Sequence, residues 1–171
     1  MTIFTQKSSK MKVFSSILGV FALFLTIFII STQSSCSKSG GCSITVNYTN
    51  DNNATQKTAM INFCTANNIT YTTHPSGILY QIITPGSATR PNLCESISMT
   101  YTGTLLNGTK FDAGTISYPL SQLIVGWQIA VPLIGRGGHI KVVIPSSLAY
   151  GSQSAGSIPP NSPLFFDIVL N

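Results

Sequence analysis

Charged side chains are scarce in this chain, since Asp, Glu, Lys and Arg make up only 8% of its 171 residues. Three of the nine positive charges belong to Lys7, Lys10 and Lys12, so residues 36–171 carry six Lys and Arg against four Asp and Glu. A net charge of +2 without a basic cluster disfavours nucleic-acid binding, which usually needs a basic patch. Solubility must then depend on Ser, Thr, Asn and Gln, a composition that suits an exported protein.

Histidine and paired cysteines are also few. The chain has two histidines and four cysteines, with no C-x-x-C pair and no His at ligand spacing from a Cys. We therefore expect no metal site and no cofactor. Neither His74 nor His139 has an adjacent Cys or Ser motif, so hydrolysis by a Ser-His-Asp arrangement is not expected.

The amino end holds the long apolar run of the chain. Three lysines precede the uncharged residues 13–30, which is typical of an export signal or a membrane anchor, and the run is long enough for a transmembrane helix. Cys36 follows small residues, as at a bacterial lipoprotein processing site, although Gln33 replaces the usual aliphatic residue. We predict residues 1–35 as a signal peptide or membrane anchor and Cys36 as a lipidation site.

Two other outcomes at the amino end remain open, an uncleaved anchor and an ordinary cleaved signal. Each would place the globular part outside the cytoplasm, on the periplasmic side of the cell envelope. With Cys36 modified, an oxidising compartment permits one disulfide among the other three cysteines. Cys42 and Cys94 lie in polar stretches, so we predict that they pair. Cys64 lies on the apolar face of a predicted helix and is interpreted as a buried thiol.

Sequence patterns predict several elements in residues 42–90, after a Ser/Gly linker at 36–41. Apolar residues at helical spacing indicate a helix, and β-branched segments around a Pro/Gly turn indicate a hairpin. The predicted elements are a short strand at 43–47, a helix at 54–66 capped by 50–53 and stopped at 67–68, and strands at 69–73 and 78–84 around a turn at 74–77.

The rest of the chain, residues 91–171, predicts more strands and one short helix. Asn107-Gly108 is a tight-turn sequence with a strong hairpin preference. The predicted elements are strands at 95–105, 139–144 and 164–170 and a helix at 122–131, which Pro132 and the following glycines end. Many short strands with one helix favour an α+β domain, an antiparallel sheet around a helix.

Several short motifs follow one another in this second half. They are Tyr101-Thr102-Gly103, Phe111-Asp112, Gly126-Trp127, Ala149-Tyr150-Gly151, Ile158-Pro159-Pro160 and Phe165-Phe166-Asp167. In this order and spacing they resemble the FKBP-type peptidyl-prolyl cis-trans isomerases, over roughly 95–171. The resemblance implies an antiparallel sheet wrapped around a short α-helix, with residues 91–171 as the isomerase domain. Residues 42–90 look like the helix and hairpin that precede this domain in many bacterial members.

The resemblance also implies which residues form the site. Trp127 would be the floor under the proline ring, and Asp112 would lie at the pocket edge. The Ile124 N–H and the Tyr150 hydroxyl would donate hydrogen bonds to substrate carbonyls. The implied catalytic residues are Tyr101, Phe111, Asp112, Trp127, Tyr150 and Phe166, and the implied substrate-binding residues are Ile116, Leu123, Ile124 and Ile158.

The sequence departs from the family in its loops. The segment after Asp112 is shorter than in many relatives and lacks the arginine that often pairs with this aspartate. Ile116 stands where phenylalanine is usual, the sequence SQSAGS at 152–157 replaces bulkier loop residues, and Ser157 stands where an aliphatic residue is common. Loops of this kind touch the residues that flank proline, so these changes bear on affinity and sequence preference, and they leave the aromatic positions intact.

The reaction that the resemblance implies makes and breaks no covalent bond. An X–Pro amide rotates over a barrier of roughly 18–20 kcal/mol, so a catalyst needs an apolar cradle and aimed donors, with neither nucleophile nor metal. We expect a monomeric isomerase that acts on proline-containing polypeptides, assists the folding of exported proteins and is held at the membrane by a lipid or helix. The alternatives are a proline-binding chaperone or assembly subunit with little turnover, and a purely structural lipoprotein.

Overall fold

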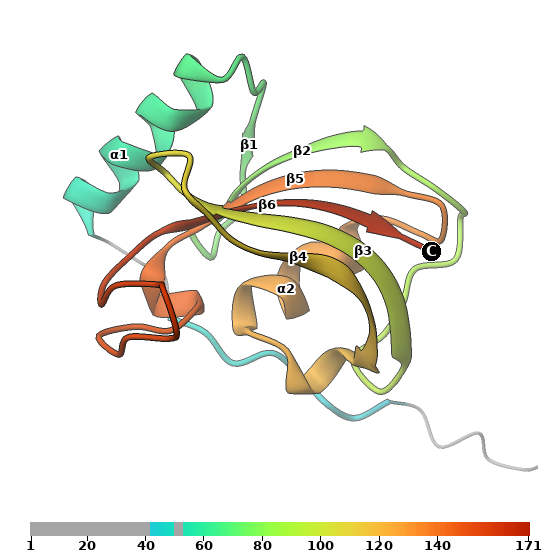
Figure 1. Ribbon diagram of the computed structural model, residues 1–171. Helices are drawn as coiled ribbons and strands as arrows, with labels where there is room; N and C mark the ends of the chain where they lie inside the picture. Colours follow the sequence, from blue (N-terminus) through green and yellow to red (C-terminus); the bar gives the residue numbers. More distant parts are fainter. Residues whose placement is uncertain (1–41, 50–52) are drawn as a thin grey trace, which may run out of the picture. The chain divides into compact units, whose positions relative to one another are not determined.

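The structure is a computed structural model that describes residues 42–49 and 53–171. The described residues belong to one compact unit, Ser39–Asn171. Its elements are α1 (Ala54–Ala66), β1 (Thr72–Thr73), β2 (Leu79–Thr84), β3 (Ser96–Leu105), β4 (Lys110–Pro119), η1 (Leu120–Gln122), α2 (Val125–Ala130), η2 (Val131–Leu133), β5 (His139–Ile144), η3 (Ser146–Leu148) and β6 (Leu164–Leu170), drawn in Figure 1.

All six strands form one antiparallel sheet in the order β1-β2-β5-β6-β3-β4. Figure 1 shows β3 and β4 curving around α2, which lies against the concave face of the sheet. The helix comes close because Gly126 has no side chain: a Cβ there would lie 2.4 Å from Cγ2 of Ile144 in β5. The predicted α+β fold, an antiparallel sheet wrapped around a short helix, is confirmed.

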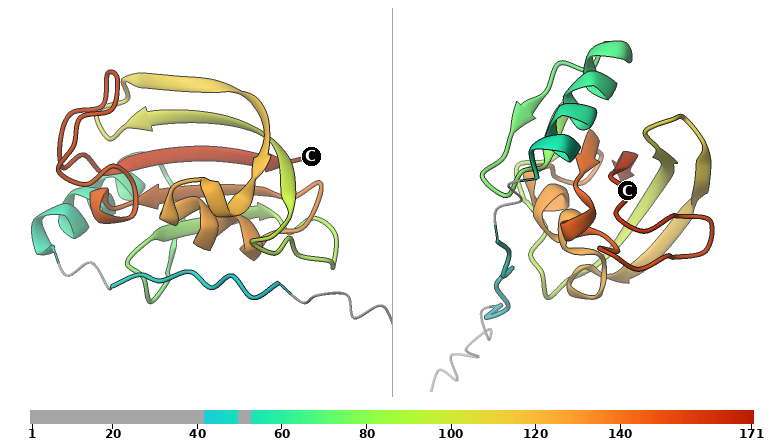
Figure 2. Two further views of the ribbon diagram at one scale, coloured as in Figure 1. Left: turned by 90° about the horizontal axis from the view of Figure 1, so that it is seen from below. Right: turned by 90° about the vertical axis from the view of Figure 1, so that its left-hand side faces the viewer.

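Alternation along the strands divides the core between the two faces of the sheet. In β5, Val142 and Ile144 pack in the larger cluster on the α2 face, whereas Val143 belongs to a smaller cluster with α1 on the other face. Figure 2 shows the two helices on opposite sides of the sheet. Successive side chains of a strand point to opposite faces, so one strand sequence binds both helices to the sheet.

The helix predicted at 54–66 is confirmed with the same bounds as α1. The Asn53 side chain accepts a hydrogen bond from the Gln56 N–H, and the helix ends at Asn67. Met60 and Cys64 are its buried residues, and burial raises the pKa of the Cys64 thiol to about 11. The predicted burial of Cys64 is thus confirmed, and the raised pKa keeps its thiol protonated.

Cys42 and Cys94 form a disulfide, as predicted. The bond attaches the segment 42–49 to the domain, where its residues line a hollow together with Leu93 and Ile129. The strand predicted at 43–47 is wrong, because this segment is extended without sheet pairing. Of the described strands, only the edge strands β1 and β4 have a free side for pairing. The segment lies next to Ile129 of α2 instead, where it pairs with neither edge.

Two further elements differ from the sequence prediction. The ten-residue strand β4 was not predicted, because it lies at the sheet edge and its side chains are mostly exposed, so it lacks an apolar alternation. The helix predicted at 122–131 begins only at Val125 and is flanked by the short 3-10 turns η1 and η2. The hairpin around 74–77 is confirmed, although its first strand is only Thr72–Thr73.

β2 pairs with β5, so residues 42–90 contribute a strand to the same sheet as residues 91–171. The division of the chain at residue 90 stays a prediction. The apolar run 13–30, the linker 36–41 and Cys36 lie outside the described residues. Within residues 42–49 and 53–171, no helix has the length and apolar character that crossing a membrane requires.

Candidate functional site

A cavity of about 140 Å³ opens between α2 and the curved part of the sheet. A cavity of roughly 150 Å³ lined by apolar side chains is large enough for benzene, so this one can hold a five-membered ring. Nine of the ten residues predicted for the site line it: Tyr101, Phe111, Asp112, Ile116, Leu123, Ile124, Trp127, Tyr150 and Phe166.

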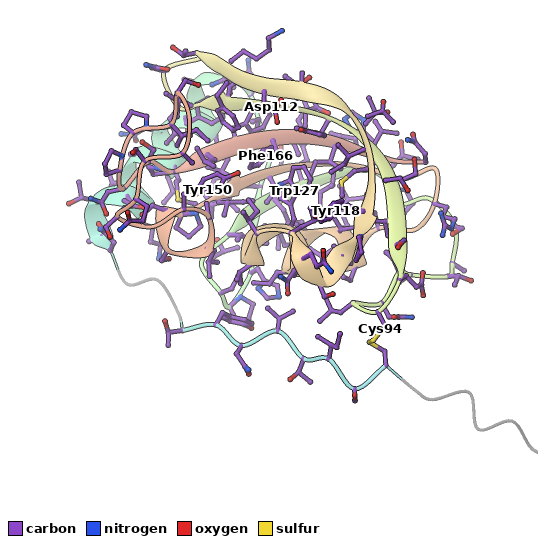
Figure 3. All side chains as sticks on the ribbon, turned by 60° about the horizontal axis from the view of Figure 1, so that its bottom comes forward. Cys94, Asp112, Tyr118, Trp127, Tyr150 and Phe166 are labelled. Atoms are coloured by element: carbon purple, nitrogen blue, oxygen red, sulfur yellow. A yellow bond between two sulfur atoms is a disulfide. The ribbon has the colours of Figure 1, made fainter. Side chains whose placement is uncertain are left out.

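Four aromatic rings form the inner part of the cavity. Trp127 meets the Tyr101 ring at 4.9 Å between centroids and the Phe166 ring at 5.0 Å, both edge to face. Phe111 meets Phe166 in the same way at 5.6 Å. In Figure 3, Trp127 from α2 and Phe166 from β6 lie between the helix and the sheet. Edge-to-face pairs are a favoured geometry for aromatic rings, so the rings hold one another in place.

A β-bulge in β4 explains why two consecutive residues face the cavity. Asp112 pairs with Gly103 and Lys110 pairs with Thr104, so Phe111 is an additional residue on β4. In a regular strand, Phe111 and Asp112 would point to opposite faces. The bulge re-aims one side chain and thereby places both the ring and the carboxylate at the cavity.

Gly103 makes room for the rings, although it was not among the residues predicted for the site. A Cβ on Gly103 would lie 2.6 Å from Cζ of Phe111 and 2.8 Å from Cε1 of Phe166. Contacts this short do not occur between real side chains, so only glycine lets both rings approach β3. The Tyr101-Thr102-Gly103 motif contained this residue, but its importance depends on a contact that the sequence does not show.

The one charged group of the cavity is Asp112. Its Oδ2 accepts a hydrogen bond of 2.5 Å from the Tyr101 hydroxyl, and its Oδ1 accepts one of 2.9 Å from the Ala113 N–H. Burial raises the pKa of Tyr101 to about 12, with smaller contributions from the hydrogen bond to Asp112, from that carboxylate's charge and from Tyr150. The Tyr101 phenol is therefore neutral at physiological pH and holds the carboxylate at the cavity edge.

Two hydrogen-bond donors remain for a bound molecule. Ile124 precedes α2 as its N-cap, and its N–H has no hydrogen-bond partner among the residues that the structure describes. Amide groups at a helix start are free in this way. Tyr150 is 41% exposed, on the loop between η3 and β6, and its side chain lines the cavity. Both donors therefore border the apolar space.

Trp127 lines the cavity and is only 5% exposed. Its indole Nε1 is buried and has no hydrogen-bond partner among the described residues. An unpaired buried donor costs about 1–3 kcal/mol, a cost that a residue selected only for the core would avoid. The unpaired Nε1 is therefore consistent with a tryptophan whose ring serves to line the cavity.

Ile158 is the one predicted site residue that the structure does not bring to the cavity. It is 5% exposed, forms an isolated bridge with Ala155 and packs in the main core. Its predicted role in substrate binding stays a prediction. In the described residues, no three His, Cys, Asp or Glu side chains lie close enough together to hold a metal ion.

Comparison with known proteins points to one family. The sequence model of the FKBP-type peptidyl-prolyl cis-trans isomerases matches residues 87–171. The FKBP-type isomerase FkpA of Aeromonas hydrophila is 42% identical over 100 residues, which are 56% of this chain and 37% of that protein. The outer membrane protein MIP of Legionella longbeachae is 41% identical over 102 residues, which are 56% of this chain and 44% of that protein. The chain therefore spans less than half the length of these relatives.

Solved structures are similar over a larger part of the chain. The crystal structure of FkpA from Escherichia coli matches with a TM-score of 0.62 and 35% identity, covering 70% of this chain and 58% of that one. A peptidyl-prolyl cis-trans isomerase from Pseudomonas syringae matches with a TM-score of 0.56 and 31% identity. That match covers 67% of this chain and 92% of the other. The similarity thus includes fold and sequence together.

Proposed function

Because this chain belongs to the FKBP-type peptidyl-prolyl cis-trans isomerase family, we propose that it catalyses rotation about X–Pro peptide bonds. The observation that carries the proposal is the cavity itself, a small and mostly apolar space lined by Trp127 and by the rings of Tyr101 and Phe166 beside it. Its substrates are proline-containing segments of polypeptides, and it acts on them as a monomer.

Such a cavity lowers the rotation barrier by removing water. Resonance makes the planar amide polar and stable, and the barrier of roughly 18–20 kcal/mol is the cost of losing that resonance. Water stabilises the planar amide more than the less polar twisted one. A prolyl ring seated over Trp127 brings its amide next to apolar walls, so the planar ground state loses more solvation than the twisted state does. No group of the enzyme needs to gain or lose a proton.

The two donors at the cavity edge complete the proposed mechanism. These donors, the free N–H of Ile124 and the hydroxyl of Tyr150, form no covalent bond with the substrate. They donate hydrogen bonds to the carbonyls that flank proline. Donors aimed at one geometry favour the state that presents its carbonyl oxygens in that geometry. We propose that the two donors fit the twisted amide best, because rotation about its C–N bond turns the carbonyl oxygen out of the plane that it occupies in the ground state.

A peptide assay tests this function. We expect residues 37–171 to accelerate the cis–trans exchange of a short X–Pro peptide, measured by NMR exchange spectroscopy. We expect Trp127→Leu to reduce kcat/KM by at least about tenfold, or about 1.4 kcal/mol of transition-state stabilisation. Circular dichroism shows whether the variant still folds. An unaltered exchange rate in the presence of the folded wild-type chain would refute the proposed activity.

The same experiment separates catalysis from simple binding. A proline-binding chaperone would bind the peptide, broadening its NMR signals, without accelerating exchange. Val169→Ala is a suitable control, because Val169 is an exposed residue of β6 outside the cavity. Equal losses of rate in Trp127→Leu and Val169→Ala would mean that general destabilisation, and not the cavity, sets the rate.

We further propose that the chain works outside the cytoplasm, anchored by a lipid on Cys36, and assists the folding of exported proteins. The basic and apolar segment before Cys36 supports this proposal. The disulfide Cys42–Cys94 also supports it, since such bonds persist in oxidising compartments. Mass spectrometry of the native amino end tests the anchor, and a native chain that still contains the residues before Cys36 would refute lipidation.

A further inference from the structure

The loop that carries Tyr150 is held by two residues at its ends. The Ser146 carbonyl accepts hydrogen bonds from the N–H of Ala149 at 2.9 Å and of Gly151 at 2.8 Å. The Asn161 N–H donates to the Gly151 carbonyl at 2.8 Å. Both chain neighbours of Tyr150 are therefore positioned by Ser146 and Asn161.

One side chain from α1 contacts both of these residues. Gln56 accepts a hydrogen bond from the Ser146 N–H at 3.0 Å through Oε1, and its Nε2 donates to the Ser146 hydroxyl at 2.8 Å. The same Nε2 lies 3.4 Å from the Asn161 carbonyl and donates to it. Ser146 is only 5% exposed, so its polar groups depend on these partners, since a buried unpaired group is costly.

Gln56 is itself fixed on a well-anchored helix. It is in the first turn of α1, where its N–H is bonded to the N-cap Asn53. The helix is held to the sheet by the buried Met60 and Cys64 and by Phe63, whose ring lies 5.1 Å from that of Phe165. Figure 2 (right) shows the first turn of α1 beside the orange segment that follows β5.

We propose that Gln56 is a positioning residue for the prolyl isomerase site, which acts through Ser146 and Asn161 on the placement of Tyr150. The proposal deepens the proposed function and rests on it. Gln56 lies outside residues 87–171, the part that matches the family. The helix before the matched region therefore contributes to the site, although none of its residues lines the cavity.

This role differs from a purely structural one in what it predicts. If Gln56 only stabilised the fold, its loss would lower activity in proportion to the unfolded fraction, whether or not Tyr150 has a hydroxyl. If it positions Tyr150, its loss matters only while that hydroxyl is present. The two single changes then fail to add, as is usual for residues of one network.

The test uses the full-length chain with Gln56→Met, Tyr150→Phe and the double variant. Met is as long as Gln but makes none of the three hydrogen bonds. We expect Gln56→Met to lower kcat/KM for an X–Pro peptide by roughly three- to tenfold, the range that one or two hydrogen bonds represent. In the Tyr150→Phe background we expect no further loss. Hydrogen exchange at the Gly151 amide should become faster in Gln56→Met.

Two more variants control the experiment. Asn62→Met places the same new side chain at an exposed position of the same helix. It should change neither kcat/KM nor the rate of hydrogen exchange at the Gly151 amide. Gln56→Glu retains acceptors for the Ser146 N–H and hydroxyl but loses the donor to Asn161, so we expect it to recover part of the activity. Because Glu keeps most contacts, it also provides the answer if Gln56→Met fails to fold.

Three results would overturn the proposal. The first is unchanged exchange at Gly151 in both Gln56 variants, and the second is a full additional loss of kcat/KM in the Tyr150→Phe background. The third is equal losses in Gln56→Met and Asn62→Met. A wild-type chain without isomerase activity would instead refute the proposed function, and exchange at Gly151 would then decide alone whether Gln56 positions this loop.

Discussion

The hydroxyl of Tyr101 and the carboxylate of Asp112 are joined by a hydrogen bond of 2.5 Å at the edge of the cavity. The two residues come from neighbouring strands, and Asp112 lies on the same face of the sheet as Tyr101 because it pairs with Gly103, two residues further along β3. The bond links a wall of the cavity to its only charged group. It fixes the rotamer of both side chains, and it makes the Tyr101 phenol a sensitive reporter of the site.

We expect Asp112→Asn to lower the pKa of Tyr101. In the wild type this pKa is about 12, against an ordinary value of 10.0, with burial as the largest cause and Asp112 next. Removing the negative charge leaves burial in place, so the pKa should fall but stay above 10.0. Tyrosinate absorbance, recorded as the difference from Tyr101→Phe, measures it, and an unchanged pKa would mean that the two groups do not interact in solution.

The raised pKa also predicts how stability depends on pH. A phenol with a higher pKa in the folded state than in the unfolded state favours folding as long as it is protonated. That contribution is fully present below pH 10 and is lost as the pH rises towards 12. The free energy of unfolding of the wild type should therefore fall more steeply over this interval than that of Tyr101→Phe, as urea titrations at a series of pH values would show. Parallel curves for the two proteins would contradict this.

We expect Gly103→Ala to damage the cavity and Gly114→Ala to leave it intact. Both glycines face the concave side of the sheet, because Gly103 pairs with Asp112 and Gly114 with Tyr101. A Cβ on Gly103 would press on the rings of Phe111 and Phe166, whereas a Cβ on Gly114 would meet nothing within 4 Å. Overpacking of this kind costs about 1–3 kcal/mol.

The comparison of these two variants separates packing from a general effect of the substitution. Gly103→Ala should lower both the free energy of unfolding and kcat/KM, the latter by about tenfold for each 1.4 kcal/mol that falls on the transition state. Gly114→Ala should change the free energy of unfolding by less than about 0.5 kcal/mol, as is usual for exposed positions, and should leave kcat/KM close to that of the wild type. Similar losses in both variants would show that replacing glycine in these strands, and not contact with the Phe111 and Phe166 rings, causes the loss.

The sequence predicted the elements that show a clear apolar periodicity and missed the one that lacks it. The strands 139–144 and 164–170 agree with β5 and β6 because buried apolar residues recur at every second position along each of them. β4 was missed because an edge strand shows only part of this pattern. The segment 43–47 alternates like a strand, yet it has no strand edge beside it, and pairing depends on neighbours that a local pattern does not reveal.

The site follows the same rule. Its lining residues were predicted because the family resemblance identifies motifs, and motifs are local. The contacts that support those residues are not local: Gln56 meets Ser146 across 90 positions of the chain, and Phe111 meets Gly103 through a bulge. Ile158 has the expected neighbours in sequence, but its side chain turns into the core. The features of the site that were not predicted are therefore contacts between residues that lie far apart in the sequence.

Loss of the disulfide should destabilise the protein without abolishing its activity. The bond between Cys42 and Cys94 spans a sequence separation of 52 residues, for which loop-closure entropy predicts a contribution of up to about 4 kcal/mol. Neither cysteine lines the cavity. We expect the Cys42→Ser, Cys94→Ser double variant to lower the urea midpoint and to keep kcat/KM within about twofold of the wild type, a difference of about 0.4 kcal/mol.

The control for this prediction is the wild type under reducing conditions. Its urea midpoint should fall to that of the double variant, because Cys64 is buried and does not exchange with the bridge. A large loss of activity on reduction, at a urea concentration where the protein stays folded, would contradict the separation of the disulfide from the site. It would mean that the segment 42–49 acts on α2 through Leu93 and Ile129.

The single tryptophan of the chain offers a direct view of the cavity. Trp127 is its only tryptophan and lines the cavity, so tryptophan emission has one source. A prolyl ring that enters the cavity displaces water from the indole, and its less polar surroundings should shift the emission to shorter wavelength. A proline-containing peptide should produce this shift with a saturating titration, and the same peptide with Ala in place of Pro should not. If emission stays constant at peptide concentrations that saturate isomerisation, the proline ring does not sit on Trp127, and catalysis occurs elsewhere on the protein.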